Sequence, residues 1–148
     1  MIKLSVILKE LKTVRRVSNH LTKLKQLESQ IKSTDDIKLK RQLAIICVKL
    51  IYPIWNIYHP EDDRVLKAIN AIEDYNNNKI GESKLSIHIN QLHNMLNNDE
   101  VSFSAAMDVI DAVIYAATDV ELDEVALLSM LATREYFKTK WGSVITND

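Results

Sequence analysis

The sequence contains few of the residues that build tight turns. Only two glycines and two prolines occur in its 148 residues, where average usage would give about ten glycines and about seven prolines. All-β folds need many tight turns, and phosphate-binding loops need several glycines close together. The shortage argues against both kinds of structure and favours an all-helical protein.

Cysteine and long apolar runs are scarce as well. A single cysteine, Cys47, excludes an intramolecular disulfide and a cysteine-based zinc cluster. The longest apolar stretch, from Leu43 to Ile57, is interrupted by polar residues and is shorter than the roughly 20 residues that cross a bilayer. The apolar run from Leu4 to Leu8 is shorter than the roughly 7–15 residues of a signal peptide. We therefore expect a cytoplasmic protein in which Cys47 is a reduced core residue.

The net charge of −1 hides a strong asymmetry. Residues 1–50 carry twelve Lys or Arg and four acids, whereas residues 51–148 carry seven basic and sixteen acidic residues. This split predicts one helical domain, residues 1–148, made of a basic arm (1–32) and an acidic body (33–148). The two halves could neutralise each other, or the basic half could bind a partner protein or nucleic acid.

Hydrophobic periodicity predicts an all-α protein, with apolar residues that recur at helical spacing in six stretches. These stretches cover about residues 4–31, 35–58, 60–75, 83–97, 102–117 and 118–141. The second is apolar nearly all round after Leu43, which predicts a central, buried helix. Thr118 and Glu121 fit a capping box at the start of the sixth. We predict a single-domain irregular bundle of about six helices with a long basic N-terminal helix.

The first helix is predicted to be unusually long, roughly 40 Å at 1.5 Å per residue. Its apolar stripe lasts about four heptads, and monomers rarely leave such a stripe uncovered. We therefore expect part of it to project from the domain and to self-associate, which would give a homodimer. Its cationic side chains form a predicted partner surface that includes Arg15, Arg16, Lys23 and Lys25.

The most distinctive motif runs from Trp55 to Ile69, WNIYHPEDDRVLKAI. A proline in the first turn of a helix loses no hydrogen bond, and acids such as Asp62 and Asp63 favour the positive helix end. A well-capped helix start therefore explains these residues on its own. We expect Arg64 to be at least half buried and to form a salt bridge with a carboxylate of the motif or of a neighbouring helix.

This motif also resembles the signature of a known family. The residues that carry the resemblance are Trp55, Pro60, Asp62, Asp63, Arg64, Ala68 and Ile69. Their order is similar to that in small all-helical immunity proteins, which accompany bacterial polymorphic toxins, and the likeness extends over about residues 35–136. The resemblance implies a binding site that includes Trp55, His59, Pro60, Asp62, Asp63 and Arg64.

The resemblance also implies a function. Such a protein is non-enzymatic, needs no cofactor, and neutralises a partner protein, either a toxin or a host or defence protein. Steric occlusion and charge complementarity would provide the mechanism. The frequent Ile, Asn and Lys residues fit AT-rich codons, which indicate a gene of a phage or mobile element.

Two alternative functions belong to other classes of protein, a metal-dependent enzyme and a nucleic-acid binder. Asp108 and Asp111, and likewise Glu121 and Glu124, are three residues apart and share a helix face. Two facing pairs could hold Mg²⁺, as in all-helical phosphohydrolases, provided that the four carboxylates converge. Solvated faces and helix starts explain the same spacing. The basic first helix could instead bind nucleic acid with an affinity that falls steeply with salt, although few aromatics are present to stack on bases.

Overall fold

The computed structural model describes the backbone of residues 4–146 and the side chains of residues 4–5, 15–16 and 19–140. Over this range the chain forms six helices and no strand, which confirms the predicted all-α class. The helices are α1 (Leu4–Ser33), α2 (Ile37–Tyr58), α3 (Arg64–Asn76), α4 (Glu82–Asn97), α5 (Ser104–Ala116) and α6 (Leu122–Thr146). None of them, over the part described, has the length and hydropathy of a membrane-spanning helix.

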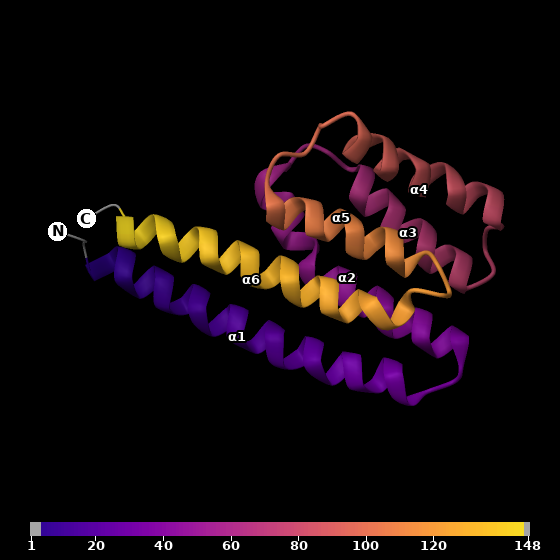
Figure 1. Ribbon diagram of the computed structural model, residues 1–148, viewed down its shortest axis with the longest axis horizontal. Coiled ribbons are helices and arrows are strands. Elements are labelled where there is room, and N and C mark those ends of the chain that lie inside the picture. The colour runs from indigo at the N-terminus through magenta and orange to yellow at the C-terminus, as the bar shows by residue number, and fades with distance from the viewer. Residues whose placement is uncertain (1–3, 147–148) are drawn as a thin grey trace.

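The helices form a bundle from which one antiparallel pair extends. Figure 1 shows α1 and α6 lying side by side and reaching together beyond the other four helices. The connections 59–63 and 98–103 lie at the end of the bundle that faces this extension. The connections 34–36, 77–81 and 117–121 lie at the opposite end. The predicted projection of α1 is therefore present, but α6 of the same chain accompanies it.

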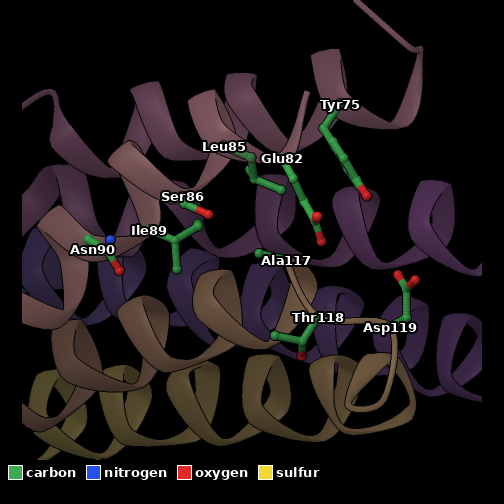
Figure 2. A pocket seen from close by; sticks show the side chains of 9 residues that line it. All are labelled: Tyr75, Glu82, Leu85, Ser86, Ile89, Asn90, Ala117, Thr118 and Asp119. Atoms are coloured by element: carbon green, nitrogen blue, oxygen red, sulfur yellow. The ribbon is translucent and has the colours of Figure 1, made fainter. Parts of the chain in front are cut away.

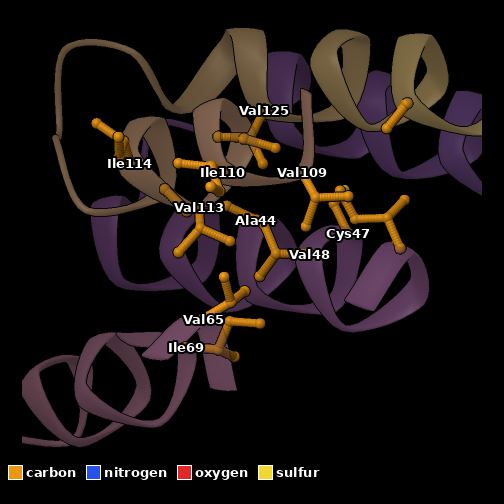
Figure 3. Packing of buried hydrophobic residues seen from close by; sticks show 14 of the residues in the cluster. Ala44, Cys47, Val48, Val65, Ile69, Val109, Ile110, Val113, Ile114 and Val125 are labelled. Carbon is orange, nitrogen blue, oxygen red and sulfur yellow. The ribbon is translucent and has the colours of Figure 1, made fainter. Parts of the chain in front are cut away.

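The centre of the bundle is α2, as its apolar sequence predicts. Its buried side chains face α1, α3, α5 and α6. In Figure 3, Ala44 and Val48 of α2 lie between Val65 of α3 and Val113 of α5. Buried alanines along α5 keep its side chains short, so that α5 and α6 pack closely. Cys47 is fully buried, and burial raises the pKa of its thiol to about 12.

Helix α1 buries its described apolar stripe against its own chain. Leu24, Leu27 and Ile31 are almost completely covered, and the helix packs along α6 and α2. Lys32 pairs with Glu28 of the same helix at 3.7 Å. The side chains of residues 6–14 lie outside the described residues, so the expected self-association through this part stays a prediction.

Ion pairs join the basic and acidic halves of the sequence, as one interpretation of the asymmetry expects. Lys40 pairs with Asp123 at 2.9 Å, Arg41 with Asp119 at 2.7 Å and Lys49 with Glu73 at 2.7 Å. All three cations belong to α2 and not to the arm at 1–32. The two halves therefore neutralise each other in part, through the central helix.

Two predicted helix starts are wrong. Helix α3 begins at Arg64, so that Pro60 lies in a turn instead of the first helical turn. The reason is that the Asp62 carboxylate accepts the backbone N–H of Arg64 and thus closes the turn ahead of the helix. Helix α6 begins at Leu122. The Thr118 hydroxyl lies within hydrogen-bond distance of the Tyr115 carbonyl and the Glu121 carboxylate, so the predicted capping box does not form.

Candidate functional site

The motif forms the connection from α2 to α3, and Trp55 anchors it. The Trp55 side chain is fully buried in the last turns of α2. Its indole N–H donates a hydrogen bond to the carbonyl of Asp62 at 3.1 Å. The ring of His59 stacks on the indole with the centroids 4.2 Å apart. Trp55 therefore holds the loop from inside the core and is not itself available to a partner.

Asp62 and Arg64 form the second anchor. Arg64 Nε lies 3.0 Å from Asp62 Oδ1, and Arg64 Nη2 lies 2.7 Å from Asp62 Oδ2, which is a bidentate pair. Arg64 Nη2 also donates to Glu100 Oε1 at 3.0 Å. The guanidinium lowers the pKa of the Asp62 carboxyl. The salt bridge predicted for Arg64 is confirmed, and its side chain, 34% exposed, is more than half buried as expected.

This arrangement ties two connections together at one end of the bundle. Glu100 belongs to the connection between α4 and α5, so that Arg64 bridges residues 59–63 and 98–103. The sequence motif alone contains no signal for Glu100, because it lies 36 residues further along the chain. Its place opposite Arg64 depends on how α3 and α4 pack. The result is a loop whose backbone is fixed by both anchors.

The outer side of this loop is acidic and open. Pro60, Glu61 and Asp63 are exposed, and residues 59–64 line an open concavity of about 620 Å³. Asp63 pairs across one helical turn with Lys67 at 3.2 Å. His59 Nε2 is buried and finds no hydrogen-bond partner among the described residues. The motif therefore has an inner set of residues that fix the loop and an outer set that a partner can reach.

The predicted basic surface lies elsewhere, on α1. Arg15, Arg16, Lys23 and Lys25 are exposed, and none of them is paired with a carboxylate in the described part of the chain. Arg16 and His20 border a narrow apolar groove of about 90 Å³ between α1, α2 and α6. Burial there, together with the charge of Arg16, lowers the pKa of His20.

A second concavity lies at the opposite end of the bundle. It measures about 330 Å³ and is lined by residues of α3, α4 and the connection between α5 and α6. Figure 2 shows Tyr75 and Glu82 on one side of it and Asp119 on the other. Arg41 fixes part of this wall, because its guanidinium pairs with Asp119 and lies 5.3 Å from the centroid of the Tyr75 ring. No sequence motif pointed to this pocket.

The four carboxylates of the magnesium alternative do not come together. Asp108 and Asp111 lie on the outward face of α5, whereas Glu121 precedes α6 and Glu124 belongs to its first turn. Among the described residues, no group of three or more His, Cys, Asp or Glu is placed to hold a metal ion. The proposed magnesium site is therefore wrong, since the spacing along each helix does not control how the two helices turn toward each other.

Other groups surround Asp108 and Asp111 instead. Burial, together with the nearby charges of Asp111 and Glu135, raises the pKa of Asp108 to about 6. Burial also raises the pKa of Asp111, while His93 of α4 opposes the shift. Sequence analysis missed Glu135. The small residues of α5 predict close packing against α6, but the rotation of α6 decides which of its residues lies beside Asp108.

The fold and the motif together define an all-helical binding protein of the immunity class. Residues 9–130 match the family model described as immunity protein Imm5. Because this match covers more than half of the chain, the chain belongs to the Imm5 immunity protein family, whose members are toxin-neutralising binding proteins and not enzymes. No curated protein and no solved structure gives a significant match. The matched range includes most of α1, which the sequence-based resemblance, starting near residue 35, left out.

Proposed function

We propose that this protein binds one cognate toxin and neutralises it by covering the toxin surface that acts on the cell. Membership of the immunity family is the observation that carries the proposal. The mechanism needs no cofactor and no reaction, only a complex that outlives the encounter of the toxin with its target. A preorganised binding surface serves this purpose, because little conformational entropy is lost when the complex forms.

The loop at 59–64 meets this requirement, and we include it in the binding surface. Trp55 and the Asp62–Arg64 pair fix its backbone from within. Glu61 and Asp63 then face solvent as carboxylates at fixed positions. A cationic patch on the toxin would be attracted to them, and such complementarity increases the association rate and selects the partner. In this proposal Trp55, Asp62 and Arg64 are positioning residues, whereas Pro60, Glu61 and Asp63 make the contacts.

The test begins with capture of the toxin. The tagged full-length protein is used to pull down partners from the native host, and a captured toxin is purified and titrated with the protein by calorimetry. Co-expression of the two then measures rescue of growth. We expect a complex of nanomolar affinity, equal to about −12 kcal/mol, and full rescue. A protein that neither binds any toxin from its host nor restores growth would overturn the proposed function.

The contribution of the loop is tested with charge-matched variants. The double variant Glu61→Gln with Asp63→Asn removes two exposed carboxylates from the loop. Its control, Asp35→Asn with Glu82→Gln, removes two exposed carboxylates from the opposite end of the bundle. We expect the loop variant to bind the toxin more weakly and the control to bind normally. Equal affinities would exclude the loop from the interface and leave the function intact.

The other expectations drawn from the sequence stay predictions. They are the homodimer, the cytoplasmic location, the origin in a phage or mobile element, and the basic partner surface of Arg15, Arg16, Lys23 and Lys25. Sedimentation at micromolar concentration decides the first of them. A clean 17.0 kDa species would contradict the dimer.

A further inference from the structure

The outward side of the α5–α6 pair carries apolar side chains that no other element of the described chain covers. Met107 of α5 is 38% exposed and Leu131 of α6 is 42% exposed. At the start of α5, Phe103 is 49% exposed. The inward residues of the same helices, such as Val109 and Ala132, are completely buried. The exposed side chains of Phe103, Met107 and Leu131 are therefore not part of the buried core.

Carboxylates lie among these apolar side chains and lack cationic partners. Asp108 and Asp111 of α5 are partly buried, and the charge of Glu135 on α6 acts on Asp108. No ion pair joins any of the three to a cationic side chain within the part of the chain that is described. His93 of α4 acts on Asp111 in the opposite sense to burial and favours its ionised form. We define the α5–α6 face as Phe103, Met107, Asp108, Asp111, Leu131 and Glu135.

The α5–α6 face is continuous with the end of the bundle that carries the motif. The ring of Phe103 stacks on Tyr58 with the centroids 4.5 Å apart, and Tyr58 meets Tyr136 edge to face at 6.5 Å. Tyr136 directly follows Glu135 on α6. Phe103 also ends the connection whose Glu100 holds Arg64. One partner can therefore touch the aromatic residues, the carboxylates and the acidic loop together.

We propose that the toxin docks on the α5–α6 face, and that the toxin surface seated there presents Lys or Arg side chains beside apolar ones. This inference rests on the proposed function and specifies the chemistry of the partner. The apolar and aromatic side chains supply the area that drives association, which is the usual composition at the centre of an interface. The carboxylates select a cationic partner, because none of them forms an ion pair within the described part of the chain.

Toxin binding at the α5–α6 face should depend on the protonation of Asp108. In the free protein, burial and the charges of Asp111 and Glu135 favour the protonated form. A cation of the toxin favours the ionised form, so complex formation releases a proton at mildly acidic pH. We therefore expect affinity to fall as the pH drops from 7 to 5. Asp111 should act in the same direction, because burial raises its pKa as well.

The decisive variant is Asp108→Asn, titrated with the purified toxin that the wild type captures. We expect its affinity at pH 7 to fall by roughly tenfold, as for loss of one desolvated charge pair, and its pH dependence to flatten. Its thermal stability should not fall, which separates a role in binding from a role in the fold. The control Asp35→Asn carries the same change in charge at the opposite end of the bundle and should bind like the wild type.

The apolar part is tested with Met107→Gln combined with Leu131→Gln, against the exposed control Ile87→Gln on α4. We expect weaker toxin binding only for the double variant, and protection of α5 from hydrogen exchange in the wild-type complex. Unchanged affinity of both Asp108→Asn and the double variant would overturn this inference, while toxin binding by the wild type would keep the proposed function. If the wild type binds no toxin, both fail. A wild-type dimer that the double variant converts to a monomer would also overturn it, because a second copy would then cover the face.

Discussion

Asp62 and Asp108 are both partly buried aspartates, and their surroundings shift their pKa values in opposite directions. The guanidinium of Arg64 binds both carboxylate oxygens of Asp62, and the pKa of Asp62 falls. Asp108 has no such partner among the described residues, and burial beside Asp111 and Glu135 raises its pKa to about 6. The first carboxylate stabilises the fold in its ionised form, whereas the second is more favourable when it is protonated.

The opposite pKa shifts distinguish contacts that stabilise the fold, around Asp62, from a surface that a partner can reach, around Asp108. Around Asp62, every strong contact is internal and holds two connections in place. Around Asp108, the charges of Asp111 and Glu135 are also negative, and no ion pair neutralises the three carboxylates within the described part of the chain. Proteins commonly tolerate such unfavourable groups where function requires them, at some expense of stability. Substitutions at the two places should therefore change stability in opposite directions.

The largest loss of stability is expected at Trp55, which anchors the loop at 59–64. Trp55→Ala removes a fully buried indole, its stacking on His59 and its hydrogen bond to Asp62. We expect a loss of about 3–5 kcal/mol in the free energy of unfolding, typical of large-to-small changes at buried aromatics. Urea denaturation followed by circular dichroism measures it. The exposed control Ile87→Ala should stay within about 0.5 kcal/mol of the wild type, and a Trp55→Ala protein as stable as that control would contradict the anchoring role.

Arg64→Ala should destabilise the fold less, because the pair is only partly buried. It leaves Asp62 and Glu100 without their counter-charge, and we expect a loss of about 1–3 kcal/mol. The pH dependence of this loss shows whether the charge of Asp62 is its origin. The folded-state pKa of Asp62 is lowered, so the stabilisation is present above the unfolded pKa and is lost as the pH falls through the folded one. The stability gap between wild type and variant should therefore narrow in acid, and a constant gap down to pH 2 would exclude the Asp62 charge as its origin.

Asp108→Asn should change stability in the opposite direction. Because the folded-state pKa of Asp108 is raised to about 6, the ionised carboxylate destabilises the fold at pH 7. This cost falls as the pH drops through 6 and is lost only near the ordinary aspartate pKa of about 4. We expect the variant to gain on the order of 1 kcal/mol at pH 7 and much less at about pH 4. Thermal melts at both pH values decide the sign. A variant that is less stable than the wild type at pH 7 would mean that the Asp108 carboxylate has a cationic partner in solution.

The comparison also explains how far sequence reasoning could go. Periodicity and the scarcity of glycine predict six helices and a central α2, because helical spacing and burial are local properties of the sequence. The motif predicts the Arg64 ion pair, since Asp62 lies two residues away. Glu100 and Glu135 could not be predicted, because their positions depend on how helices rotate against one another. The same rotation separates Asp108 and Asp111 from Glu121 and Glu124, which share only their spacing.

The smallest effect on stability is expected for the ion pairs that join the basic and acidic halves of the sequence. Lys49 and Glu73 approach to 2.7 Å, but their side chains are 49% and 41% exposed. Water screens such a pair, and holding two long side chains together costs entropy, so a double-mutant cycle with Lys49→Met and Glu73→Gln should give a coupling of about 0–1 kcal/mol. The coupling should shrink further as salt is added. A coupling above about 2 kcal/mol that salt leaves unchanged would show that the ion pairs of α2 hold the two halves together. The weak coupling expected here means instead that the apolar core holds the two halves together. A sequence can therefore have a strong charge asymmetry although its paired surface charges add little to the stability of the fold.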